Sequence, residues 1–445
     1  MEGTEMDLQL IMKEPISRLN AVEDDAVKAL DNGDHDRALF FRMQALALAK
    51  LCMDDPNVAE KDTILAKAHL RLSATYLGMG FGDQAYWHAQ RAMDSGDPRR
   101  SGSVNPAGNS ILLVSILLAL AKAMLMRADA RCQSYLTRAL QINIDLTSEE
   151  DPSNAAIFEA FGDLFVFAKD SGAPMIENDT QGMKRTNKKQ PGGKSPKSPK
   201  TPTSPTNRLQ IGAMDEANQD LYERGLAYFD KAWELVNKSI KGTVKGNGKK
   251  VTIDPALAQL YSKIAKTKAK QGCDEEASGM YDKAISSHEK AIVPNGSAVA
   301  HLNYELGCIY RRLKKYRDAM SSLEKASKFC EEQKDIGRSD PLALVLQKEQ
   351  GATMYEKKEY GNAKGIFEEL LQLQRMEYGG GSVMVAETLE YLGDCALGLK
   401  DLPEACHRYN RAVRIMKRKY GALDPNVRDL VDKIRQLNLE DQSWE

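Results

Sequence analysis

Small residues recur along the chain at two fixed spacings. In the C-terminal half, a small residue is followed twelve positions later by alanine, and seven positions after that by alanine or leucine. The sets are Ala265–Ala277–Ala284, Gly307–Ala319–Ala326, Gly351–Ala363–Leu370 and Gly393–Ala405–Ala412, which start 42 or 44 positions apart. Recurrence at a fixed period of this size is the signature of a solenoid, in which stacked units bury a shared core.

One repeat can be read in detail between residues 300 and 331. Apolar side chains fall at helical spacing on both sides of a polar break, Lys314–Lys315. The pattern predicts a helix, a tight turn and an antiparallel helix. Gly307, Ala319 and Ala326 are expected where helices cross, because a larger side chain there would push them apart at a cost of about 1–3 kcal/mol.

The combination of Gly307, Tyr310, Ala319 and Ala326 resembles the tetratricopeptide repeat, whose usual length is about 34 residues. The longer period here implies helices about one turn longer, as in kinesin light chains. The segments 385–393, 412–416 and 419–427 strengthen that likeness, and they are also similar to the cilium-associated family of tetratricopeptide repeat protein 23. The stretch from Ala45 to Leu72 resembles the N-terminal part of the same family.

This resemblance implies an all-α fold, a superhelical solenoid of about eight helix pairs with a C-terminal capping helix. The expected order is an N-terminal segment (1–18); repeats one to three and the first helix of repeat four (19–170); a disordered basic insertion rich in Ser, Pro and Lys (171–218); the second helix of repeat four (219–240); a basic Gly/Lys loop (241–253); repeats five to eight (254–420); and the capping helix and tail (424–445).

The insertion carries eight basic residues between 184 and 208 and no acidic residue in that range. We call it the basic arm; its cations include Lys184, Arg185, Lys188, Lys189, Lys194, Lys197 and Lys200. Ser195, Ser198, Thr201 and Ser204 each precede proline and are possible phosphorylation sites. Four phosphates at about −1.5 to −2 charges each would cancel the charge of the arm. The arm is interpreted either as a solvated linker or as a contact to an acidic surface such as tubulin.

Composition gives no support for catalysis. The six histidines are scattered without a cysteine or carboxylate at metal-ligand or nucleophile spacing, and the seven cysteines are single. Neither Gly379–Gly381 nor Pro191–Gly193 follows a strand pattern, so neither predicts a phosphate loop. We therefore expect no enzyme, cofactor or metal site. A net charge of −1 gives no overall attraction to nucleic acid or membranes, and the uncharged stretch 111–121 is too short to span a bilayer.

The resemblance implies that the first helix of each pair lines a partner-binding groove. The expected groove positions are His301, Tyr304, Cys308 and Arg311 in repeat six, Val345, Lys348, Ala352 and Tyr355 in repeat seven, and Glu387, Glu390, Asp394 and Leu397 in repeat eight. This set predicts a groove that is mixed to basic in the middle and acidic at its end, which suits a basic and apolar peptide or helix. A single lysine among the matching positions argues against the carboxylate grip of chaperone-binding members.

These observations together predict a non-catalytic scaffold for other proteins. The cilium-associated resemblance makes a structural component of a ciliary or flagellar axoneme, or of another microtubule assembly, the first expectation. The alternative is a soluble cytoplasmic adaptor of the kinesin-light-chain type. The absence of a heptad coiled coil ahead of the repeats counts against that alternative. The acidic start, without a signal-peptide pattern, and the unpaired cysteines fit a cytoplasmic, reducing location in both cases.

Overall fold

The computed structural model describes residues 15–31, 34–54, 58, 60–96, 106–129, 131–171, 221–247, 255–290, 296–332 and 341–442. Within these ranges the chain is all-α and contains no strand. It divides into two compact units, residues 1–242 and 243–445, and each is described by itself. The basic arm and its four Ser/Thr-Pro sites lie outside the described residues.

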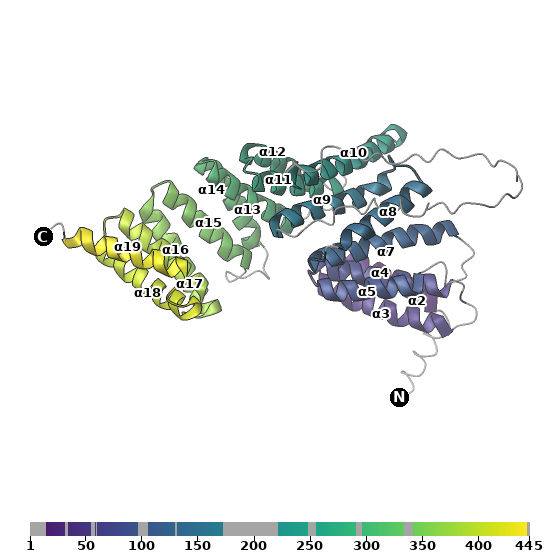
Figure 1. The fold of residues 1–445 in the computed structure, drawn as a ribbon, viewed down its shortest axis with the longest axis horizontal. Helices are drawn as coiled ribbons and strands as arrows, with labels where there is room; N and C mark the ends of the chain where they lie inside the picture. Colours follow the sequence, from purple (N-terminus) through teal and green to yellow (C-terminus); the bar gives the residue numbers. More distant parts are fainter. Residues whose placement is uncertain are drawn as a thin grey trace, which may run out of the picture. The chain divides into compact units, whose positions relative to one another are not determined.

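The first unit consists of four successive helix pairs, shown in Figure 1. They are α2 (Pro15–Asp31) with α3 (His35–Asp54), α4 (Lys61–Gly78) with α5 (Gly82–Gly96), α7 (Pro106–Met126) with α8 (Cys132–Leu146), and α9 (Ala155–Ser171) with α10 (Leu221–Asn247). A 3-10 turn, η1 (Pro152–Asn154), leads into α9. The aromatic ring of Tyr228 on α10 stacks on Phe161 and Phe165 of α9, so these two helices pack together across the insertion.

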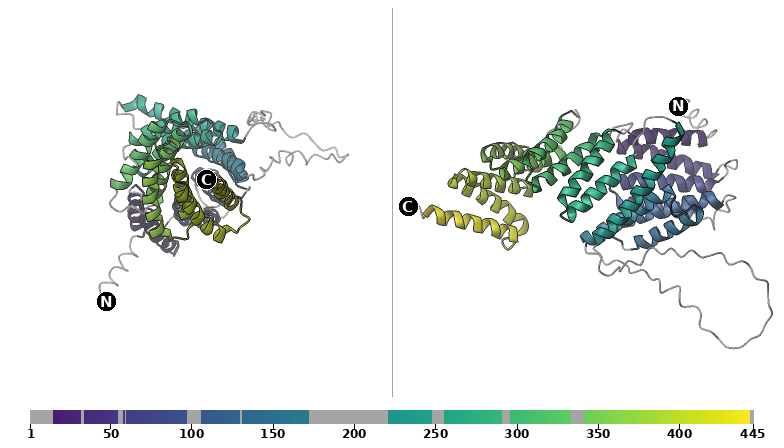
Figure 2. Two further views of the ribbon diagram at one scale, coloured as in Figure 1. Left: turned by 90° about the vertical axis from the view of Figure 1, so that its left-hand side faces the viewer. Right: turned by 90° about the horizontal axis from the view of Figure 1, so that it is seen from above.

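The second unit contains four further pairs and a last helix, whose consecutive packing can be followed in the right-hand view of Figure 2. The pairs are α11 (Pro255–Lys270) with α12 (Asp274–Glu289), α13 (Gly296–Arg312) with α14 (Tyr316–Glu332), α15 (Pro341–Glu356) with α16 (Tyr360–Tyr378), and α17 (Val383–Gly398) with α18 (Leu402–Tyr420). Helix α19 (Pro425–Gln442) packs on α18 and buries Val427, Leu430 and Leu437. It therefore covers the open side of the last pair, as the sequence predicts.

The recurring small residues lie in the core, which confirms their predicted place at the helix crossings. Ala265, Ala277, Ala319, Ala363 and Ala405, for example, are fully buried. The glycines have close neighbours sixteen positions later in the chain: a Cβ on Gly307, Gly351 or Gly393 would lie within 2.8 Å of Leu323, Phe367 or Tyr409, respectively. Carbon atoms pack at about 3.5–4.0 Å, so only glycine lets these helix pairs approach so closely.

The tight turn inside each pair of the second unit has one repeated geometry. Gly272, Lys314, Lys358 and Lys400 stand in the left-handed region at φ of 80°, 59°, 67° and 65°. In each turn the next residue donates a backbone hydrogen bond to the carbonyl five positions earlier, as Lys315 N does to Tyr310 O at 2.8 Å. This is the Schellman motif, which satisfies carbonyls at the end of a helix and fixes the reversal.

One element is longer than the sequence predicts. Helix α10 continues to Asn247, through Gly242 and Gly246, whereas the basic Gly/Lys loop was expected to begin at residue 241. A glycine costs a helix only about 1 kcal/mol relative to alanine, which one further turn of backbone hydrogen bonds can offset. The part of the expected loop that remains, residues 248–253, lies outside the described residues.

Candidate functional site

Consecutive first helices of the second unit are joined by ion pairs that each span about one repeat. We call the participating residues the first-helix face. They are Lys266 and Glu305, Arg311 with Glu349 and Glu356, Lys348 and Glu387, and Lys433 with Glu390 and Asp394. The pairs link α11 to α13, α13 to α15, α15 to α17, and α17 to α19. The same surface that was expected to bind a partner therefore also ties the repeats together.

The centre of this face is Arg311, near the end of α13. Its guanidinium reaches across to α15, where the Glu349 carboxylate lies 2.9 Å from Nη2 and the Glu356 carboxylate accepts from Nη1. All three side chains are at most about one-third exposed. Pairs shielded in this way are screened less by salt than surface pairs, and a guanidinium held by two carboxylates has a fixed orientation.

Two lysines hold the carboxylates of α17. Lys348 Nζ on α15 lies 2.6 Å from Glu387, and Lys433 Nζ on α19 lies 2.8 Å from Glu390 and 3.3 Å from Asp394. Burial would lower the pKa of Lys433, but hydrogen bonds and charge from Glu390 and Asp394 outweigh it and raise the pKa overall. Lys433 belongs to the capping helix, which was not among the expected groove positions. It neutralises part of the acidic end that the sequence predicts.

The net charge of the first-helix face nevertheless stays negative. Its ion pairs involve four cations and six carboxylates, which leaves a formal charge of 4 − 6 = −2. A partner segment that brings basic side chains is therefore favoured over an acidic one.

The other expected groove residues lie on the same helices in different environments. His301 is exposed, whereas Tyr304 and Tyr355 are half-buried. Burial raises the pKa of the Tyr304 and Tyr355 hydroxyls, so both stay neutral donors at physiological pH. Tyr304 also contacts the thiol of Cys308, whose pKa burial raises to about 12. Half-buried tyrosines of this kind are common anchors in protein interfaces, because they combine apolar area with a polar tip.

Five members of the first-helix face were not identified from the sequence: Lys266, Glu305, Glu349, Glu356 and Lys433. Each forms its ion pair with a residue 38 to 45 positions away. The sequence did contain a signal for them: each has a residue of opposite charge about one repeat length away in the chain, on the neighbouring first helix or on the capping helix. A search of the sequence for such pairs at the repeat period would have found them.

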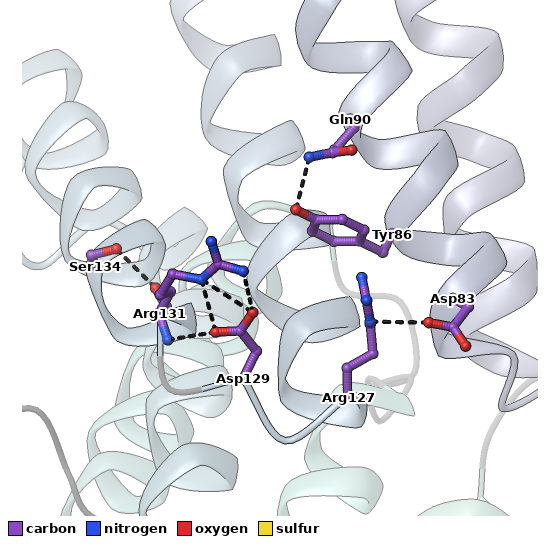
Figure 3. A network of polar contacts seen from close by, with 7 residues as sticks. All are labelled: Asp83, Tyr86, Gln90, Arg127, Asp129, Arg131 and Ser134. Carbon is purple, nitrogen blue, oxygen red and sulfur yellow. Dashed lines mark hydrogen bonds and ion pairs between the residues drawn. The ribbon is translucent and has the colours of Figure 1, made fainter.

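A polar network in the first unit is a structural joint between helices. Figure 3 shows Arg127 paired with Asp83 at 3.0 Å and Arg131 held by Asp129, close to Tyr86. The Arg127 guanidinium lies 4.5 Å from the centre of the Tyr86 ring. Hydrogen bonds from Arg131 lower the pKa of Asp129 to about 2. These contacts join α5 to the turn between α7 and α8, which sets the path of the chain there.

Two buried histidines form another polar cluster of the first unit. His69 on α4 and His88 on α5 face each other with their Nδ1 atoms 2.9 Å apart, beside the rings of Tyr76 and Trp87. Among the described residues, no group of three or more His, Cys, Asp or Glu side chains is placed to hold a metal ion. The seven cysteines, all within the described ranges, form no disulfide bond. In the same ranges no helix has the length and apolar character needed to cross a bilayer.

The sequence of the second unit matches a known repeat family. The tetratricopeptide repeat model matches residues 256–332 and 342–418, which contain α11 to α18 except for the first residue of α11, the first residue of α15 and the last two residues of α18. None of the curated protein sequences matches this chain.

Solved structures that resemble this chain are helical repeat proteins. The apo form of RapI superposes over 96% of this chain and 97% of its own length, with a TM-score of 0.51 and 9% identity. BtubC from P. vanneervenii covers 49% of this chain and 87% of its own, with a TM-score of 0.37 and 18% identity. A putative kinesin light chain from Podosopora anserina covers 45% and 93%, with a TM-score of 0.36 and 15% identity. At these identities the similarity concerns the fold alone.

Proposed function

Since the chain carries tetratricopeptide repeats, a fold that generally serves as a non-catalytic scaffold for other proteins, we propose that its first-helix face binds a segment of a partner protein. The observation that supports this most directly is the set of cross-repeat ion pairs. They hold charged groups of both signs in fixed positions along four consecutive repeats of the second unit. Side chains ordered before binding lose less entropy when a partner arrives, so the face is prepared for recognition.

The chemistry of the face indicates the kind of segment it binds. Its net charge of −2 favours basic side chains, and the half-buried Tyr304 and Tyr355 offer apolar area to aliphatic ones. A helix or extended peptide with alternating basic and apolar residues satisfies both features. The partner gains most where it replaces an existing cation, for example by bringing an arginine to Glu387 in place of Lys348.

Charge reversal tests this proposal directly. The variant Glu387→Lys with Glu390→Lys changes the face by four charge units, while Glu324→Lys with Glu369→Lys makes the same change on exposed positions of α14 and α16. Partners that co-purify with the full-length protein are compared by quantitative mass spectrometry. A partner set lost in the first variant and kept in the second supports the proposal. Equal retention in both variants contradicts it.

A finer proposal concerns the place of the scaffold in the cell. We infer a structural role in a ciliary or flagellar axoneme, or in another microtubule assembly, from the resemblance of the repeats to the cilium-associated family and from the charge of the basic arm. An arm of this charge suits an acidic partner such as tubulin. Phosphorylation of the Ser/Thr-Pro sites would then weaken the contact.

Fractionation of ciliated cells tests the finer proposal. The tagged protein is expected to remain with the microtubule skeleton in detergent and to leave it at high salt. Replacement of the six lysines of the arm (Lys184, Lys188, Lys189, Lys194, Lys197 and Lys200) by alanine is expected to release it at lower salt. If the protein leaves with detergent, or never enters the cilium, the axonemal role is wrong and the soluble adaptor takes its place.

A further inference from the structure

The C-terminal ends of α16 and α18 form one edge of the second unit. These two helices run parallel, because each is joined to α17 by a short reversal. Arg408 on α18 pairs with Glu368 on α16 at 3.3 Å, which places the two helices in register. Glu368 lies ten residues before the end of α16, and Arg408 lies twelve before the end of α18. The ends of the two helices therefore face the same edge of the unit, and we call residues 375–381 and 414–424 the basic edge.

The basic edge carries the two most exposed large apolar side chains among the described residues. Met376 is 83% exposed and Leu423 is 77% exposed, and Tyr420 and Tyr378 are 51% and 41% exposed. They lie at or just beyond the C-terminal ends of α16 and α18. Exposed apolar groups that gather at one place mark a surface that meets something other than water.

Cations surround these apolar side chains. Arg375, Arg414, Lys417, Arg418 and Lys419 stand against only two carboxylates, Glu377 and Asp424, so the edge has a formal charge of 5 − 2 = +3. Asp424 is occupied by a backbone hydrogen bond from Asn426 at the start of α19. A chain that is nearly neutral overall therefore separates charge locally.

The cations of the edge are not neutralised by the protein itself. Arg414, Lys417 and Arg418 form no ion pair within the described part of the chain, and Arg375 has a buried Nη2 atom without a hydrogen-bond partner there. Burial, followed by repulsion from Arg411 and Arg408, lowers the pKa of Arg375. Like charges held together in this way favour an external anion.

The backbone between the helices is open. A Cβ on Gly379, Gly380 or Gly381 would meet no atom within 4 Å, and the same holds for Gly421. Both connecting turns therefore lack bulky side chains beside the exposed apolar ones, and a broad surface can approach the backbone there. A narrow peptide would need walls or pockets, whereas the side chains of this edge are mostly exposed.

We propose that the basic edge binds the surface of an anionic lipid bilayer. Leu423 and Met376 enter the boundary between headgroups and acyl chains, Tyr378 and Tyr420 lie at headgroup level, and the four exposed cations, Arg414, Lys417, Arg418 and Lys419, contact the lipid phosphates. Basic residues beside aliphatic and aromatic ones form the usual combination for peripheral attachment, which is distinct from a segment that crosses the membrane. This attachment is independent of the first-helix face, and it leaves that face free for a protein partner.

Vesicle flotation with the full-length protein tests the proposal. The probes are phosphatidylcholine vesicles with and without phosphatidylserine. We expect binding only to the vesicles with phosphatidylserine, and weaker binding as salt screens the attraction. Arg414→Glu with Arg418→Glu is expected to reduce the fraction bound at least tenfold, because each basic residue near a charged membrane contributes a several-fold gain in affinity. The matched control is Lys325→Glu with Lys328→Glu, which makes the same charge change on exposed positions of α14 and is expected to bind as the original protein does.

A second pair of variants separates the apolar contribution from charge. Met376→Ser with Leu423→Ser keeps every charge and replaces two exposed side chains, so folding is not at risk. We expect it to bind vesicles at low salt and to lose most of its binding at high salt. The proposal is overturned if the original protein does not bind phosphatidylserine vesicles, or if the α14 control loses as much binding as Arg414→Glu with Arg418→Glu. It is also overturned if soluble polyglutamate binds the edge while vesicles do not, since that result would assign it to an acidic protein.

Discussion

The close approach of α17 and α18 at Gly393 predicts that a larger residue at this position destabilises the fold. A Cβ at this position would lie 2.5 Å from Cε1, 2.7 Å from Cδ1 and 2.9 Å from Cζ of Tyr409. Since carbon atoms in contact stand about 3.5–4.0 Å apart, the ring or the helix must move by roughly 1 Å. The ring cannot move aside easily, because Tyr409 is fully buried and its hydroxyl donates a hydrogen bond to Asp394.

The expected cost of Gly393→Ala follows from two opposing effects. Overpacking of a core costs about 1–3 kcal/mol, and the rigid surroundings of Tyr409 favour the upper end. Alanine stabilises a helix by about 1 kcal/mol relative to glycine. The net expectation is a loss of about 2 kcal/mol in the stability of the α17–α18 pair.

Gly365→Ala is the matched control for this substitution. Gly365 also lies inside a helix, α16, but it is exposed and a Cβ there meets no atom within 4 Å. Only the helix preference then applies, so the variant should gain about 1 kcal/mol. The two alanine variants are therefore expected to differ by about 3 kcal/mol in opposite directions.

Amide hydrogen exchange is the suitable assay, because a two-unit repeat protein need not unfold in one step. The expected result for Gly393→Ala is faster exchange in α17 and α18, with little change in α11 and α12. Slower exchange in α16 is expected for Gly365→Ala. If both variants protect the second unit equally, the small residues do not set the spacing of the helices and the reasoning is refuted.

Three further outcomes are expected. Burial and the neighbouring His88 lower the pKa of His69 to about 4, below the usual 6.5, so the unfolded chain binds a proton more readily than the folded one. Stability is therefore fully present above pH ~6.5 and decreases as the pH falls toward 4, by about 3 kcal/mol. Chemical denaturation at several pH values should show this slope, a smaller slope in His69→Gln, which keeps the lowered pKa of His88, and the original slope in a variant of the exposed His301. Lys433→Met removes the cation that pairs with Glu390 and Asp394, and because the lysine is 40% exposed we expect only about 1 kcal/mol of destabilisation. The loss should be seen as faster amide hydrogen exchange in α17, and unchanged exchange would mean that water already compensates the charge of these carboxylates. The Cys308 thiol, with a pKa of about 12, should be alkylated much more slowly at neutral pH than the exposed Cys273. Mass spectrometry after a timed iodoacetamide pulse measures the ratio of the two alkylation rates, and equal rates would contradict the burial of Cys308.

The fold was predictable because its determinants are local and periodic. Gly307, Ala319 and Ala326 recur at fixed spacing since the same crossing recurs in every pair, so a pattern in the sequence directly reports a contact in space. The turn at Lys314 was predicted as a polar break, but its left-handed backbone was not, because lysine gives no sign of positive φ. Glycine stands at the equivalent position 272, and that comparison between repeats was the available clue.

The candidate site was predictable only in part, for a physical reason. The resemblance to the tetratricopeptide repeat implies which residues of α13, α15 and α17 share a surface, and it placed Arg311, Lys348 and Glu387 on it. It does not reveal which of them meet, because an ion pair depends on the offset between neighbouring repeats and on side-chain reach. The expected acidic end illustrates the limit: Glu390 and Asp394 were assigned from their own repeat, while their cation comes from the capping helix.

The same ion pairs link stability of the second unit to recognition by it. Each pair on the first-helix face connects two repeats, so a partner that replaces Lys348 at Glu387 also removes a link between α15 and α17. The two helices would then be held by the partner instead, and the spacing of the repeats would follow the ligand. A bound segment with a cation at each carboxylate should therefore protect α15 and α17 together from hydrogen exchange, whereas a segment that binds elsewhere should leave their exchange unchanged. Cooperative protection of the two helices would identify the face as the binding surface even before the partner is known.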